Sequence, residues 1–222
     1  MDHHQIYWPT PTVKFEDKLC YVTEMEAEKE MCPADPRHTR RERWKRPLKT
    51  IGTVTPLTDF EWTVMGDLLV SPNIVSDFQN AGFSGVEFHP VEIFTTTETP
   101  IGRETFELRI TGWGGYAPPS SGIRVLEECS HCGRRIYSGF TNKERLFDPK
   151  QWDGSDLFII WPMPRKAFVT LKVRDFIMEH GYTGVNMKPL HELKHAVAGT
   201  FTPGNLRDWF DNSKLANILE RY

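Results

Sequence analysis

The sequence has no long apolar run and little net charge, and both absences exclude classes of protein. No apolar stretch approaches the roughly 20 residues that a membrane-spanning helix needs. The N-terminus, MDHHQIYWPT, lacks the basic and then apolar order of a signal peptide. We therefore expect a cytoplasmic protein with no membrane partner. The formal net charge of −3 over 222 residues predicts no overall attraction to nucleic acid.

Cysteine is scarce and catalytic signatures are missing. Four cysteines in a cytoplasmic chain favour thiols or metal ligands over disulfides. The chain contains no GxSxG, P-loop, HExxH or glycine-rich dinucleotide motif. His89, His180, His191 and His195 are the candidate acid–base groups, and none has a complete set of partners in the pattern. We therefore expect a protein that is not an enzyme.

What the chain does contain is a repeat. Residues 70–94 recur as residues 169–193 at a constant offset, 181 − 82 = 99, and Gly82/Gly181 and Pro90/Pro189 stay in register. Each copy reads as a capped helix with one apolar face, a glycine that ends it, and a strand of alternating polarity. The sequence thus predicts an α+β fold with two similar helix-turn-strand half-domains.

A CxxCG motif between the copies carries the clearest chemistry. Cys129 and Cys132 are separated by two residues and Gly133 follows them, with a short strand predicted on either side. This pattern is typical of half of a zinc ribbon, since two such thiolates can bind one tetrahedral zinc. A structural zinc takes four ligands, so two more must come from elsewhere. Cys20 and Cys32 are twelve residues apart and form no second pair by themselves.

These features divide the chain into four expected segments. They are an N-terminal segment with a degenerate knuckle (1–49), the first repeat half (50–122), the CxxCG hairpin (123–150), and the second repeat half with a C-terminal helix (151–222).

The N-terminal segment holds one strongly charged run. Its six cations are Arg37, Arg40, Arg41, Arg43, Lys45 and Arg46. One interpretation is a contact with phosphates or an acidic partner, with Trp44 available to stack on a base. The other is a solvated face that pairs with the acidic residues just before it. Those acidic residues, 24–31, consist of helix formers and predict a short exposed helix.

The order of these features resembles the bacterial double-CxxCG motif family, counted among the immunity proteins of polymorphic toxin systems. The matching stretches are CPADP (32–36), GVEFHPV (85–91), CSHCG (129–133), DLF (156–158) and GVNMKPL (184–190). The resemblance spans about residues 32–193. Its first motif is degenerate, because Asp35 stands at the second cysteine position and Pro36 at the glycine position.

The resemblance implies an immunity protein that neutralises a cognate toxin by direct stoichiometric binding, and it implies zinc. The candidate ligands are Cys129, Cys132 and Cys32, with His38, Asp35 or Cys20 in the fourth place; we take His38. The alternative for the site is a decayed motif that packs without metal. The alternative for the function is a zinc-ribbon nucleic-acid binder that uses the run from Arg37 to Arg46.

Overall fold

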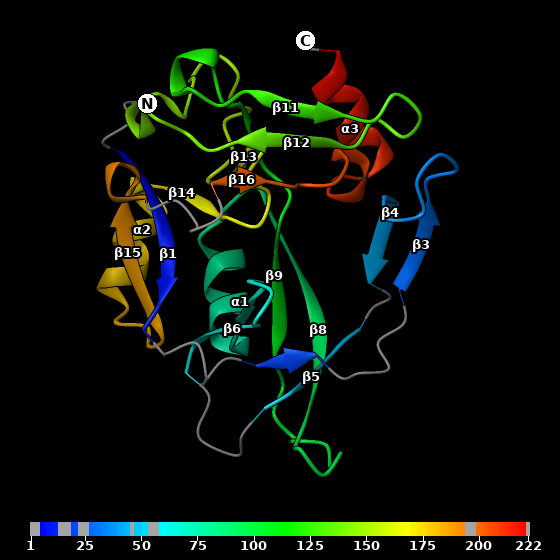
Figure 1. The fold of residues 1–222 in the computed structure, drawn as a ribbon. Coiled ribbons are helices and arrows are strands. Elements are labelled where there is room, and N and C mark those ends of the chain that lie inside the picture. The colour runs from blue at the N-terminus through cyan, green and yellow to red at the C-terminus, as the bar shows by residue number, and fades with distance from the viewer. Residues whose placement is uncertain are drawn as a thin grey trace.

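The structure is a computed structural model that describes residues 5–12, 19–21, 27–44, 47–52, 58–193 and 199–220. Over these residues the predicted α+β class is confirmed, with mixed sheets and a few short helices (Figure 1). The α-helices are α1 (Pro72–Asn80), α2 (Leu171–Glu179) and α3 (Asn212–Leu219), and 3-10 turns are η3 (Pro119–Ser121), η4 (Lys143–Arg145), η5 (Leu190–Glu192) and η6 (Leu206–Asp208).

Both copies of the repeated sequence form a helix, a glycine turn and a strand. Helix α1 leads to β8 (Val86–Phe94), and α2 leads to β15 (Val185–Pro189). The backbone turns after each helix at Gly82 and Gly181, where φ is +67° and +64°. Glycine adopts this left-handed conformation without the clash that a Cβ would cause, so the helices end there.

The copies contribute to two larger sheets. The six-stranded sheet has the order β2-β5-β8-β9-β7-β6, and the five-stranded sheet has the order β10-β13-β14-β1-β15. The remaining bounds of the first are β2 (Cys20–Tyr21), β5 (Leu48–Ile51), β9 (Phe106–Ile110), β7 (Leu68–Val70) and β6 (Phe60–Trp62). Those of the second are β10 (Trp113–Tyr116), β13 (Leu157–Trp161), β14 (Phe168–Thr170) and β1 (Ile6–Pro11).

The two sheets have the same arrangement around their inner strands, β9 in one and β1 in the other. In the first, β9 lies between β7 and β8, with Phe106 opposite Val70 and Pro90. In the second, the N-terminal strand β1 lies between β14 and β15, with Tyr7 opposite Val169 and Pro189. Tyr7 and Phe106 are themselves 99 residues apart (106 − 7 = 99). Strands β1 and β9 therefore hold equivalent inner positions in the two sheets. The pairings of β1 cross the expected segment boundaries, whereas those of β9 stay within residues 50–122.

Matching hydrogen bonds hold the copies against each other. The backbone N–H and hydroxyl of Thr183 donate to Asp59 Oδ2 at 2.9 and 2.7 Å. Those of Ser84 donate to Asp156 Oδ2 at 3.0 and 3.1 Å. One buried cluster draws side chains from both copies, including Phe78 of α1 and Val173 of α2. This cluster therefore lies between the copies, and three further buried clusters lie elsewhere in the described structure.

Two hairpins complete the fold. Strands β11 (Val125–Glu128) and β12 (Arg135–Ser138) flank the CxxCG turn and continue to β16 (Thr200–Phe201). Strands β3 (Ala27–Met31) and β4 (Thr39–Trp44) form a separate two-stranded sheet. The predicted helix over residues 24–31 is therefore wrong for 27–31, and residues 24–26 lie outside the described part. Helix propensity loses here because pairing with β4 supplies backbone partners that a short exposed helix lacks.

The register of the β3–β4 hairpin sets opposite charges across from each other. Glu28 lies opposite Arg43, and Glu30 lies opposite Arg41. The side chains of Glu28, Arg41 and Arg43 lie outside the described part of the structure, so both interpretations of the basic run stay predictions.

Candidate metal centre

The β11–β12 turn presents two cysteines from one tight loop. The N–H of Gly133 donates to the carbonyl of Cys129 at 2.8 Å, and the N–H of Cys129 donates to Arg134 O at 2.9 Å. Gly133 takes a φ of +69°, which lets the chain reverse directly after Cys132. The CxxCG spacing therefore places both sulfurs on the same side of the turn.

The β3–β4 turn presents a second pair. The N–H of Cys32 donates to His38 O at 2.9 Å, which closes the loop, and the N–H of His38 donates to Asp35 O at 2.9 Å. In Figure 1 this hairpin stands at the right of the molecule with its turn directed towards the β11–β12 turn. Residues 97 positions apart are thereby brought together (129 − 32 = 97).

The four side chains meet in one cluster. One ligand atom from each of Cys32, His38, Cys129 and Cys132 lies within 4.8 Å of the others. The Sγ atoms of Cys32 and Cys129 are 3.9 Å apart, far beyond the roughly 2.05 Å of a disulfide. Sulfurs bound tetrahedrally at about 2.3 Å from one zinc would be about 3.8 Å apart. The observed sulfur–sulfur distance therefore fits a shared metal ion.

The electrostatics of the cluster are uneven. Backbone N–H groups of Cys132 and His131, with the His38 side chain, lower the pKa of the Cys129 thiol to about 6. Burial raises the pKa of the Cys132 thiol. The thiolate is the form that binds metal, so Cys129 is the sulfur best prepared for a cation at neutral pH.

The imidazole of His38 is oriented from outside the cluster. Its Nε2 lies 3.5 Å from Asp35 Oδ2, whereas its Nδ1 is buried and has no hydrogen-bond partner. A carboxylate beside one ring nitrogen and a metal at the other is the usual arrangement of a ligating histidine. The orphaned Nδ1 therefore fits the fourth place of a zinc site.

Asp35 is in turn held by Arg37. The Arg37 backbone N–H donates to Asp35 Oδ1 at 2.9 Å, and its guanidinium donates to both carboxylate oxygens at 3.0 and 2.9 Å. These bonds keep the pKa of Asp35 well below its usual range. Arg37 is absent from the predicted metal site, and the signal that could have found it is the close spacing of Asp35, Arg37 and His38.

Two of the three options for the fourth ligand, His38 and Asp35, lie in the described part of the structure and can be compared. His38 joins the three cysteines, and Asp35 supports it rather than joining them. The side chain of Cys20 lies outside the described part of the structure. Of the other histidines, His180 stacks on Phe176 at 3.9 Å between ring centroids, and neither His89 nor His191 belongs to the cluster; His195 lies outside the described residues.

Comparison with known proteins adds no assignment. No protein-family model matches the chain, and no curated protein matches it. Among the described residues, the helices are all too short or too polar to cross a bilayer.

Proposed function

We propose that this chain is an immunity protein that neutralises one cognate toxin by direct stoichiometric binding, and that it contains a structural zinc. The observation that supports this most is the joining of two distant turns in one Cys3His cluster. A family defined by two cysteine motifs is expected to bring both to one site. Here His38 takes the place that the degenerate first motif leaves open.

The metal would be held by Cys32, His38, Cys129 and Cys132, and it would supply cohesion rather than reactivity. Four protein ligands leave no position for a substrate, which is the pattern of structural zinc sites. A zinc ion would thus tie the β3–β4 hairpin to the β11–β12 hairpin. We infer that the latter is a zinc-ribbon-type knuckle, and that the two repeat copies are equivalent half-domains.

Inhibition by occupation needs complementary shape and charge and no reactive group. The β3–β4 hairpin offers both signs of charge for such a contact, since acidic residues occur along β3 and basic residues along β4. The nucleic-acid alternative receives less support, because Glu28 and Glu30 lie opposite two arginines of the basic run. A phosphate backbone would meet that mixed charge.

The test is co-expression with a toxin domain found in the neighbouring open reading frame, and a neighbouring frame that encodes none would count against the proposal. We expect protection of the cell and an equimolar complex on size-exclusion chromatography with light scattering. His89→Ala should protect as well as the wild type, because no chemistry is assigned to that side chain. Protection at far below one molecule per toxin would show catalysis and overturn the proposal.

The zinc part is tested separately by metal analysis of protein purified without added zinc. We expect about one zinc per chain. The Cys129→Ser/Cys132→Ser variant should contain none. A wild-type content near zero, together with unchanged stability in chelator, would show a decayed site that packs without metal.

A further inference from the structure

A cleft of about 600 Å³ lies where the two repeat copies meet. Two of its walls are equivalent loops, residues 65–68 of the first copy and residues 164–167 of the second, which are 99 positions apart. Two more are the equivalent inner strands, through Pro9 and Pro11 of β1 and Leu108 and Ile110 of β9. The cleft thus lies between equivalent parts of the fold, and interfaces between similar units are a common place for small-molecule sites.

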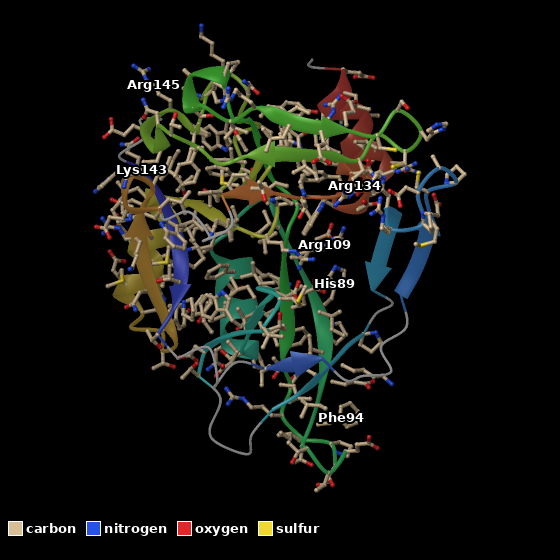
Figure 2. All side chains as sticks on the ribbon, viewed as in Figure 1. His89, Phe94, Arg109, Arg134, Lys143 and Arg145 are labelled. Atoms are coloured by element: carbon tan, nitrogen blue, oxygen red, sulfur yellow. The ribbon has the colours of Figure 1, made fainter. Side chains whose placement is uncertain are left out.

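Cations gather around this cleft although the chain is negative overall. They come from four different parts of the fold and are Arg37, Arg109, Arg134 and the adjacent Arg165 and Lys166, against three lining carboxylates, Asp67, Glu107 and Asp208. Figure 2 shows Arg109 on β9 below Arg134, which follows the CxxCG turn. A local excess of positive charge in a concave site attracts anions even when the net charge of the protein is −3.

Several of these cations are held in place by the walls. The guanidinium of Arg165 lies 5.5 Å from the Trp209 ring centroid, and Lys166 Nζ lies 4.8 Å from that of Trp8. Arg109 Nη2 donates to Trp209 O at 3.0 Å. Arg165 Nη1 donates to Met65 O at 3.2 Å. Side chains that are already ordered lose less entropy when a ligand arrives, so these contacts favour binding.

The equivalent loops differ in charge, so the cleft has an acidic side and a basic side. Asp67 in the first loop corresponds to Lys166 in the second, and Gly66 corresponds to Arg165. Buried apolar surface from Trp62 and Leu68 lies beside the acidic side. The cleft therefore combines hydrogen-bond acceptors at one side, flat apolar walls, and cations at the other.

We propose that this cleft binds a free nucleotide. Its phosphates would meet the arginines and Lys166, because guanidinium groups suit phosphate oxygens. Its base would lie against Trp62 on the acidic side and offer N–H donors to Asp67 and Glu107. The volume is within the range of small-molecule sites and is unlike the flat surface of a protein–protein contact. This site lies next to the cysteine cluster, because Arg37 also holds Asp35 and Arg134 follows the CxxCG turn, but nucleotide binding does not depend on the toxin partner.

The test uses the full chain with zinc present and titrates ATP, GTP, inorganic pyrophosphate, and the nucleosides adenosine and guanosine. Tryptophan fluorescence is a suitable readout because Trp8, Trp62 and Trp209 line the cleft, and calorimetry gives the stoichiometry. We expect one nucleotide per chain, bound at least about tenfold more tightly than pyrophosphate or nucleoside, since each carries only part of the recognised groups.

Matched variants identify the site. Arg165→Gln/Lys166→Gln should weaken nucleotide binding by about tenfold or more, because it removes charged contacts to phosphate. Lys143→Gln/Arg145→Gln removes the same charge from η4, which lies away from the cleft at the upper left of Figure 2, and should bind as the wild type does. Arg134→Gln is the second cleft variant, should the first fail to fold by circular dichroism.

Three outcomes would overturn the inference. One is the absence of saturable binding of either nucleotide at millimolar concentration. Another is equal weakening by the η4 variant and the cleft variants, which would show non-specific attraction. The third is binding of a single-stranded oligonucleotide without binding of free nucleotide, which would place recognition on a nucleic-acid backbone instead.

Discussion

At the residue scale, the candidate metal centre depends on a side chain that is not one of its ligands. Asp35 lies between Arg37 and His38: the guanidinium donates to its carboxylate at 3.0 Å, and His38 Nε2 lies 3.5 Å from it. The arginine in turn keeps that carboxylate ionised. Asp35 thus supports His38 from outside the cluster, as the outer partner of a ligating histidine does.

Removal of this carboxylate should weaken metal binding without removing a ligand. We expect Asp35→Ala to lower zinc affinity by about tenfold or more, the usual effect of losing the outer partner of a ligating histidine. Competition with a chromophoric chelator measures it. His131→Ala is the matched control, because His131 lies inside the same CxxC turn but outside the cluster. Equal affinities for both variants would mean that Asp35 does not act on the metal.

Asp67 gives a prediction about pH. Burial raises its pKa from 3.8 to about 6. The folded state therefore holds this proton more tightly than the unfolded state, and its stability falls as pH rises from about 4 to about 6. Asp67→Asn removes that loss and can keep the hydrogen bond that Thr63 donates at 2.7 Å. The variant should gain stability relative to wild type across this window and hold the gain above it.

Urea denaturation at several pH values from 4 to 7 measures the difference between the two proteins. Asp211→Asn is the control, and its stability relative to wild type should change with pH in the opposite direction. Hydrogen bonds, above all the one from the Lys214 backbone N–H, lower the pKa of Asp211. The stability of the wild type should increase relative to that of Asp211→Asn as pH rises. A pH-independent difference for Asp67→Asn would contradict the raised pKa.

At the element scale, the repeated turn contains two glycines that are required for different physical reasons. Gly181 has a φ of +64° and open space where a Cβ would lie, whereas a Cβ at Gly184 would lie 2.1 Å from Phe60 O. We expect Gly181→Ala to cost about 1 kcal/mol, the penalty of left-handed backbone. Gly184→Ala should cost about 3 kcal/mol or more, because the strand carbonyl of Phe60 cannot move aside. Urea denaturation of both variants compares them, and equal costs would rule out the close approach.

The elements that the sequence predicted are those whose signals are local. Gly82 and Gly181 end their helices, and strands β8 and β15 follow, because capping and alternation act over a few residues. The chemistry of Cys129 and Cys132 was also local. The contact between Cys129 and Cys32 has no local signal, because no pattern around Cys32 indicates which hairpin turn will lie next to it. Strand β3 was missed because its partner β4, and not its own propensity, decides its conformation.

At the scale of the whole molecule, β1 and β9 hold equivalent inner positions in the two sheets. Nothing in the sequence around Tyr7 indicates that its partners lie at Val169 and Pro189, because strand pairing is fixed by long-range packing. The side chain of Tyr7 also accepts a hydrogen bond from Arg174 Nη2 at 3.0 Å, which ties β1 to α2. Strand β1 is therefore an inner strand of the five-stranded sheet, although it lies far from its neighbours in the sequence.

Deletion of residues 1–12 should accordingly damage structure that is distant in the sequence. The variant loses the fully buried Ile6 and leaves β14 and β15 without their shared neighbour. We expect a loss of about 3 kcal/mol or more and fast amide exchange in β14 and β15. A synthetic peptide of residues 5–12, added in excess, should restore protection there. Full protection in the deletion variant without peptide would refute the dependence.

The position of β1 also determines when the chain can fold during its synthesis. The ribosome releases Tyr7 long before its neighbours Val169 and Pro189, so the nascent chain carries this strand unpaired while the residues between them are made. The first copy is incomplete over the same period, because Asp59 has no Thr183 to accept hydrogen bonds from until the second copy emerges. The two copies therefore complete their fold together, and until then the exposed strand edges are open to wrong pairing with other chains.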